Sequence, residues 1–196
     1  MSDTDEILLP PLPPVCRQHD SQLLVVDVQD RLLGAMPQAD RLRVLKASSA
    51  LISAARLLGV PLLATEQYPK GLGLTDSSLR GDLASQGRIV EKTSFSCCGA
   101  PGLMGHLDPD TRPQVIIAGI EAHVCVLQTA LELNARGFQV FVVEDATCSR
   151  NPAHHANAMQ RLRQAGVIVT VMESVLFEWM RDASHPHFKV ISQLVK

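Results

Sequence analysis

Residues 113–137, PQVIIAGIEAHVCVLQTALELNARG, decide the fold, because here a buried strand passes into a helix. The apolar run from Val115 to Ala118, closed by Gly119, predicts the strand. Apolar residues then recur at helical spacing from Val124 to Ala135, which predicts the helix. Cys125 stands at this junction, at the start of the predicted helix.

A thiol at a helix N-terminus has a physical reason to ionise. The free amides and the macrodipole of the first turn stabilise a thiolate, so the position predicts a lowered pKa for Cys125. This makes Cys125 a candidate nucleophile. The alternative is that Cys125 is a small buried hydrophobe, as many cysteines are.

Two other apolar runs each end in an ionisable side chain. The run Leu23–Val26 is followed by Asp27, and RIVEK, residues 88–92, ends in Lys92. In an open α/β sheet the functional crevice lies outside the carboxyl ends of the strands. We therefore expect Asp27, Lys92 and Cys125 to meet at one edge of the sheet.

Strand-like and helix-like segments alternate along the rest of the chain. The further segments are a helix over 39–58, a strand over 60–64, a long polar loop over 65–86, a strand over 138–143, a helix over 151–165 and a strand over 167–172. This order predicts an α/β fold: a three-layer α/β/α sandwich with a mainly parallel, six-stranded, Rossmann-like sheet. The first strand is not followed by a GxGxxG turn, so a dinucleotide site is not expected.

Length and composition predict one domain. The chain has 196 residues, of which 46% are hydrophobic, and we expect a Pro-rich arm over 1–20 and a domain over 21–196. The net charge is −2 and Lys and Arg form no stripe, so no nucleic-acid partner is expected. No apolar run reaches the roughly 20 residues that cross a bilayer, so no membrane partner is expected.

The five cysteines are odd in number and have no CxxC spacing. They indicate neither a disulfide framework nor a zinc cluster. The N-terminus opens with acidic residues instead of the basic segment of a signal peptide. The sequence therefore predicts a cytoplasmic protein.

Three motifs together resemble the isochorismatase-like cysteine hydrolase family. They are LLVVDVQ with Asp27, VEKTSFS with Lys92 and GIEAHVCV with Cys125, and the resemblance runs from about Ser21 to Met172. Within the family, TEQYPKGLG and EAHVCV resemble the subgroup of isochorismatase-domain proteins.

The resemblance implies a catalytic triad of Asp27, Lys92 and Cys125 that hydrolyses a small-molecule amide or related C–N bond through a thioester. It also implies a cis peptide between Ile120 and Glu121, and an oxyanion hole formed by the backbone amides of Glu121 and Cys125. No cofactor is expected. Metal-dependent nicotinamidases of this fold carry Asp-x-His after the second strand, whereas this chain has Thr-Glu-Gln-Tyr over 65–68, so no metal site is expected.

Three further residues are candidates for substrate binding: Gln29, Phe95 and His123. Each has a structural alternative, because Gln29 can tie down a loop, Phe95 can pack inward and His123 can serve as an ordinary polar partner. Relatives of this fold usually form dimers or larger rings. With the apolar segment Val175 to Met180, this predicts a homo-oligomer.

A second hypothesis comes from another functional class. The fold can serve as a non-catalytic binding or assembly module with a redox-sensitive thiol. An aspartate and a lysine that converge on the same thiol favour the enzyme, because a binding module needs neither a base nor a cation at that place.

Overall fold

A parallel sheet forms the centre of the protein. The computed structural model describes residues 15–196. Within them the strands lie in the order β3-β2-β1-β4-β5-β6, and each neighbouring pair is parallel. The strands are β1 (Ser21–Val26), β2 (Leu62–Gln67), β3 (Gly87–Lys92), β4 (Gln114–Ile120), β5 (Gln139–Cys148) and β6 (Ile168–Thr170). The predicted six-stranded parallel sheet is confirmed.

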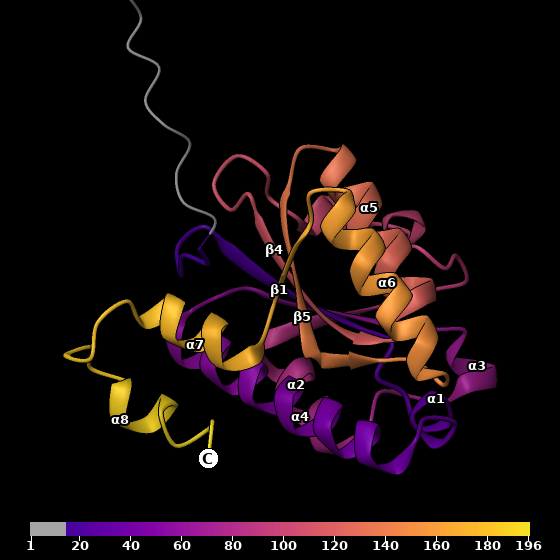
Figure 1. Cartoon of the computed structure of the whole chain (residues 1–196), viewed down its shortest axis with the longest axis horizontal. Helices are drawn as coiled ribbons and strands as arrows, with labels where there is room; N and C mark the ends of the chain where they lie inside the picture. The colour runs from indigo at the N-terminus through magenta and orange to yellow at the C-terminus, as the bar shows by residue number, and fades with distance from the viewer. Residues whose placement is uncertain (1–14) are drawn as a thin grey trace, which may run out of the picture.

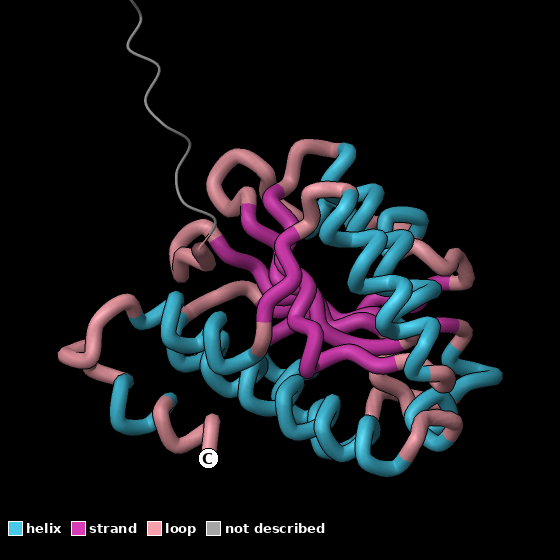
Figure 2. The backbone as a smooth tube through the Cα atoms, in the orientation of Figure 1, coloured by secondary structure: helices cyan, strands magenta, loops and turns pink. Residues whose placement is uncertain are grey.

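Helices cover both faces of this sheet (Figures 1 and 2). α2, α4 and α7 lie on one face, and α5 and α6 lie on the other. The α-helices are α1 (Asp30–Gly34), α2 (Gln38–Leu58), α3 (Pro69–Leu72), α4 (Ser77–Gln86), α5 (Leu127–Ala135), α6 (Pro152–Gln164), α7 (Met172–Met180) and α8 (Phe188–Ile191). The three-layer α/β/α sandwich is therefore confirmed.

Each face of the sheet has its own apolar core. Leu23 of β1 belongs to the same buried cluster as Leu51 of α2 and Trp179 of α7, while the next residue, Leu24, belongs to the other cluster, with Leu133 of α5. Successive side chains of a strand point to opposite faces, so a strand buried on both sides is apolar at every position. This explains the continuous apolar run before Asp27.

The apolar segment Val175 to Met180 belongs to the core, which corrects our expectation that it forms an intersubunit patch. It lies in α7, where Val175, Leu176, Trp179 and Met180 are buried against the sheet and α2. The Trp179 indole also donates a hydrogen bond to Ser21 Oγ at 2.9 Å. These four residues are apolar because they face inward, whereas Phe177 of the same segment is exposed.

The predicted loop over 65–86 contains more structure than expected. β2 extends to Gln67, and the helices α3 and α4 follow. α4 begins at a cap, since the Asp76 carboxylate accepts a hydrogen bond from Ser78 N at 2.9 Å. Only Leu79 and Leu83 of this helix are buried, and two apolar residues one turn apart are too few for a clear periodic pattern.

In the part of the chain from Val15 onward, no helix combines the length with the apolar character that a bilayer span requires. The predicted Pro-rich arm over 1–20 lies outside the described residues as far as position 14.

Gly119 allows β4 to approach β1 closely. Its φ is +121°, and a Cβ at this position would overlap the Val26 carbonyl oxygen and lie 2.6 Å from Val26 N. We expect Gly119→Ala to lower the free energy of unfolding by about 3 kcal/mol, because both backbone strain and overpacking oppose the methyl group. Urea denaturation measures this change. Gly81→Ala is the matched control, because Gly81 lies in α4 and a Cβ added there would have no neighbouring atom within 4 Å. Equal stabilities of the two variants would contradict the prediction.

Candidate active site

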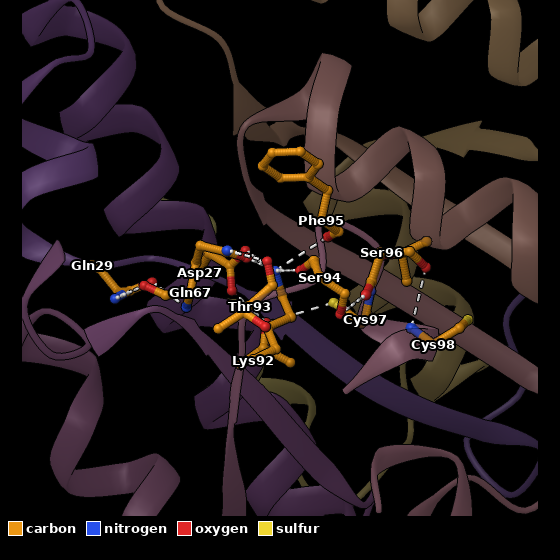
Figure 3. Close-up of polar contacts among 12 residues, drawn as sticks. Asp27, Gln29, Gln67, Lys92, Thr93, Ser94, Phe95, Ser96, Cys97 and Cys98 are labelled. Carbon is orange, nitrogen blue, oxygen red and sulfur yellow. Dashed lines mark hydrogen bonds and ion pairs between the residues drawn. The ribbon is translucent and has the colours of Figure 1, made fainter. Parts of the chain in front are cut away.

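The three residues of the predicted triad come together at the carboxyl edge of the sheet. Asp27 directly follows β1, and Lys92 is the last residue of β3. Cys125 lies in the π-helical turn Ala122–Val126, which is separated from the end of β4 by the single residue Glu121. Figure 3 shows the Asp27 and Lys92 side chains in contact. Parallel strands place all their carboxyl ends on one side, which explains this convergence.

Asp27 is a buried carboxylate with both oxygens hydrogen-bonded. Lys92 Nζ contacts Oδ2 at 2.6 Å, and the Thr65 hydroxyl donates to Oδ1 at 2.7 Å. The Asp27 and Lys92 side chains are both 0% exposed. The Asp27 backbone has a φ of 51°, in the left-handed region that few non-glycine residues adopt. Such positions cluster at functional sites.

The Lys92 ammonium is saturated with acceptors. Besides Asp27 it contacts Gln67 Oε1 at 2.6 Å and the carbonyl oxygens of Ser94 and Phe95 at 3.2 Å each. An ammonium has only three hydrogens to donate, so none is spare for a substrate. Lys92 can therefore influence a reaction through its positive charge and by holding Asp27.

Sequence reasoning did not identify Gln67. Its side-chain oxygen accepts a hydrogen bond from Lys92 Nζ. Its backbone N donates a hydrogen bond to Gln29 Oε1 at 2.7 Å, so Gln29 also holds Gln67 in place. The available signal was its position, since Gln67 ends β2 and lies beside Lys92 in the register of β2 and β3. The extension of β2 beyond the predicted strand hid that position.

The Cys125 thiol is neutral at rest, which corrects the prediction of a lowered pKa. Burial, the negative charge of Asp27 and a hydrogen-bond interaction with its carboxylate together raise the pKa of Cys125 to about 12, while the charge of Lys92 opposes the rise. Burial and a neighbouring negative charge disfavour the thiolate, in the opposite direction to a helix N-terminus. A neutral thiol beside a carboxylate is the arrangement of a nucleophile with its general base.

Alkylation measured against pH checks this protonation state. We expect the rate of Cys125 modification by iodoacetamide to rise about tenfold per pH unit between about pH 7 and pH 10, because the reactive thiolate becomes more abundant. The Cys125→Ala variant supplies the background from the other thiols. A rate that is constant from pH 6 to pH 8 would show a preformed thiolate and contradict the prediction.

A second thiol, Cys97, lies close to the same carboxylate. Its Sγ is 3.6 Å from the Thr65 hydroxyl that binds Asp27, and its backbone N donates to Thr129 Oγ1 at 2.9 Å. Burial, together with the charge of Asp27, raises the pKa of Cys97 to about 11, while the charge of Lys92 opposes the rise. Cys97 is 0% exposed, whereas Cys125 is 6% exposed.

A small cavity reaches Cys125. Its volume is about 120 Å³, and its apolar walls are Leu32, Leu72, Phe95 and Val124. Gln67, Glu121 and Cys125 complete the lining. A larger cavity of about 320 Å³ is lined by Lys92, Tyr68 and Pro101, among others, but Cys125 does not line it. We therefore assign the chemistry to the smaller cavity.

The three candidates for substrate binding occupy different places. Phe95 lines the cavity and is exposed. Gln29 is fully buried; its amide nitrogen donates to the carbonyl oxygens of Gln67 at 3.0 Å and Gly73 at 2.6 Å, so it ties down a loop (Figure 3). His123 is not in the cavity lining, and its Nδ1 lies 2.9 Å from Ser149 Oγ. Of the three, only Phe95 lines the cavity beside Cys125 and stays a candidate for substrate binding.

The backbone before Cys125 has the feature that the family resemblance implies. The peptide bond between Ile120 and Glu121 is cis. Glu121 lines the cavity, and its carboxylate forms an ion pair with Arg150 at 3.1 Å.

Possible metal ligands do not cluster in the part of the chain that the structure describes. From Val15 to Lys196, no group of three or more His, Cys, Asp or Glu side chains is placed to hold an ion. The five cysteines are all free.

Comparison with known proteins places the chain in a family. The isochorismatase domain profile matches residues 21–174. Isochorismatase domain-containing protein 2A of Mus musculus is 40% identical over 183 residues, which cover 91% of this chain and 84% of that protein. The structure of MAR1 ribonuclease from Caenorhabditis elegans has a TM-score of 0.85 at 38% identity, with 92% of each chain covered.

A more distant structure shares the fold alone. The YcaC gene product of Escherichia coli, an octameric hydrolase of unknown specificity, has a TM-score of 0.84 at 24% identity and covers 95% of this chain and 90% of its own. The profile match spans all three segments that converge on Cys125, and the mouse relative extends the likeness over nearly the whole chain. The protein belongs to the isochorismatase family.

Proposed function

We propose that the protein is a cysteine hydrolase that cleaves the C–N bond of a small amide through a thioester intermediate. The observation that carries this proposal is the neutral Cys125 thiol beside the Asp27 carboxylate, at a cavity of about 120 Å³. The buried ion pair with Lys92 supports it, because the pair fixes the carboxylate in place. Nucleophile, base and cation thus meet where a small carbonyl compound can bind.

The first half of the reaction forms the thioester. Asp27 takes the thiol proton while Cys125 Sγ bonds to the amide carbonyl carbon. The backbone amides of Glu121 and Cys125 stabilise the oxyanion of the tetrahedral intermediate. Asp27 then gives its proton to the substrate nitrogen, the C–N bond breaks, and ammonia or an amine leaves.

The second half regenerates the enzyme. A water molecule attacks the thioester carbonyl carbon, and Asp27 accepts one of its protons. When the C–S bond breaks, the carboxylic acid leaves and the proton returns to the Cys125 sulfur. Lys92 balances the charge of Asp27 throughout but transfers no proton.

A small substrate fits the cavity better than RNA, although one relative is named a ribonuclease. The cavity of about 120 Å³ is smaller than the roughly 300–1,000 Å³ of sites for drug-sized ligands. The net charge of −2, without a basic stripe, also gives no attraction for a phosphate backbone.

A screen of short primary amides, read out as ammonia release, tests the function. We expect turnover by the native protein and none by Cys125→Ala, with single-stranded RNA as a comparison substrate. RNA cleavage without ammonia release from any amide would contradict the proposal. Absence of both activities would instead favour the non-catalytic module with a redox-sensitive thiol. The five free cysteines suit the reducing cytoplasm, which we propose as the location.

We also propose that the protein is a homo-oligomer. The octameric assembly of YcaC supports this, as do the exposed apolar side chains of Tyr68, Leu74 and Phe95 on loops at the carboxyl edge of the sheet. Light scattering should give a multiple of 21.3 kDa, and Leu74→Ser should weaken the assembly. Leu42→Ser, at an exposed position on α2, is the matched control. The mass of a single chain for the native protein would contradict the prediction.

A further inference from the structure

The cavity beside Cys125 contains an acidic side chain with one unused oxygen. Arg150 binds Glu121 Oε2 through its backbone N at 3.0 Å and its Nε at 3.1 Å. Within residues 15–196, no group donates a hydrogen bond to the other oxygen, Oε1. Glu121 Oε1 is therefore available as an acceptor for a bound molecule.

The charges around the cavity are unevenly screened. The Glu121 side chain is 9% exposed, whereas its partner Arg150 is 63% exposed, so water and salt weaken the positive charge more than the negative one. The other ionic group at the site, the pair of Asp27 and Lys92, is neutral as a unit. No lysine or arginine of the described chain lines this cavity. The cavity is thus negative on balance.

Building on the hydrolase function above, we propose that Glu121 makes the cavity selective for small amides whose acyl part is neutral or bears an amine, and excludes carboxylate-bearing ones. The apolar walls accept a short hydrocarbon chain, and Glu121 Oε1 accepts an N–H from an amine. A carboxylate would lie beside Glu121 with no cation to pair with, and such repulsion is how a site rejects a close analogue. Isochorismate, after which the family is named, is a dicarboxylate and would be excluded.

Thiol reagents of different charge measure this selectivity without any turnover. Cys125 is alkylated with neutral iodoacetamide and with anionic iodoacetate, and the modified peptide is quantified by mass spectrometry. The same peptide in urea-unfolded protein corrects for the intrinsic reactivities. We expect folding to raise the rate ratio of iodoacetamide to iodoacetate by about tenfold, because a cleft of one charge sign depletes ions of that sign. A ratio equal to that of the unfolded protein would overturn the proposal.

Substitutions at the ion pair give opposite expectations. Glu121→Gln should return the ratio toward the unfolded value, and Arg150→Gln should raise it further, because it removes the compensating cation. Glu173→Gln, at an exposed position in the first turn of α7, is the matched control and should leave the ratio unchanged. Equal ratios in all three variants would show that Glu121 is not the selective group.

Three amides of equal chain length test the selectivity in turnover. Ammonia release is measured from butyramide, succinamate and 4-aminobutyramide, and we expect kcat/KM for succinamate to be at least about tenfold below the other two. Succinamate hydrolysed as well as 4-aminobutyramide would overturn the selectivity and leave the hydrolase function in place. Charge-selective alkylation without ammonia from any of the three would contradict hydrolysis of these amides and leave the selectivity in place.

Discussion

Cys125→Ala should lower kcat/KM for amide hydrolysis on the order of 10⁴-fold or more, because no other cysteine of residues 15–196 lines the cavity to form the thioester. Cys125 lines the cavity and interacts with Asp27. The substitution removes a single sulfur atom from a side chain of little bulk, so the variant should remain folded. Ammonia release and circular dichroism together measure both properties.

The neighbouring thiols provide the controls. Cys97→Ala removes the other thiol near Asp27, yet it should keep activity within about tenfold of the native protein, because Cys97 does not line the cavity. Cys98→Ala removes a half-buried thiol and should have no effect. A complete loss of activity in Cys97→Ala, with Cys125→Ala still active, would show that Cys97 and not Cys125 is the nucleophile.

Lys92→Met should destabilise the protein by about 3–5 kcal/mol and also abolish turnover, because it leaves the Asp27 carboxylate buried without a cation. Both side chains are fully buried, so water cannot replace the lost partner. Urea denaturation gives the stability, and ammonia release gives the activity. The double variant Asp27→Asn with Lys92→Met should recover much of the stability, since no unpaired charge remains, but none of the activity.

The double variant separates the two roles of the pair. If the Lys92→Met variant were as stable as the native protein, Lys92 would not compensate a buried charge. Activity in the double variant would show that Asp27 is not the base. Arg163→Met is a suitable comparison, because it breaks the exposed ion pair with Glu144, and exposed pairs contribute only about 0–1 kcal/mol.

Local pattern was sufficient where one segment carries its own signal. The apolar runs ending at Asp27 and at Lys92 placed both residues at strand ends, and the strand-to-helix junction placed Cys125 near them. The sequence pattern did not predict α4, because Leu79 and Leu83 are the only buried residues of this helix. The direction in which the apolar residues of α7 face was also wrongly inferred, since a hydrophobic run looks the same whether it covers the domain's own core or another subunit.

The sequence by itself determined the α/β/α architecture and the convergence of Asp27, Lys92 and Cys125, because periodicity is local and parallel strands all end on one side of the sheet. Only the tertiary structure decided the neutral state of the Cys125 thiol, the set of hydrogen-bond acceptors around Lys92, which includes Gln67, and the place of Glu121 in the cavity. These properties depend on burial and on distances between segments far apart in the chain. Charge interactions and desolvation change steeply with such distances, and no local pattern encodes them.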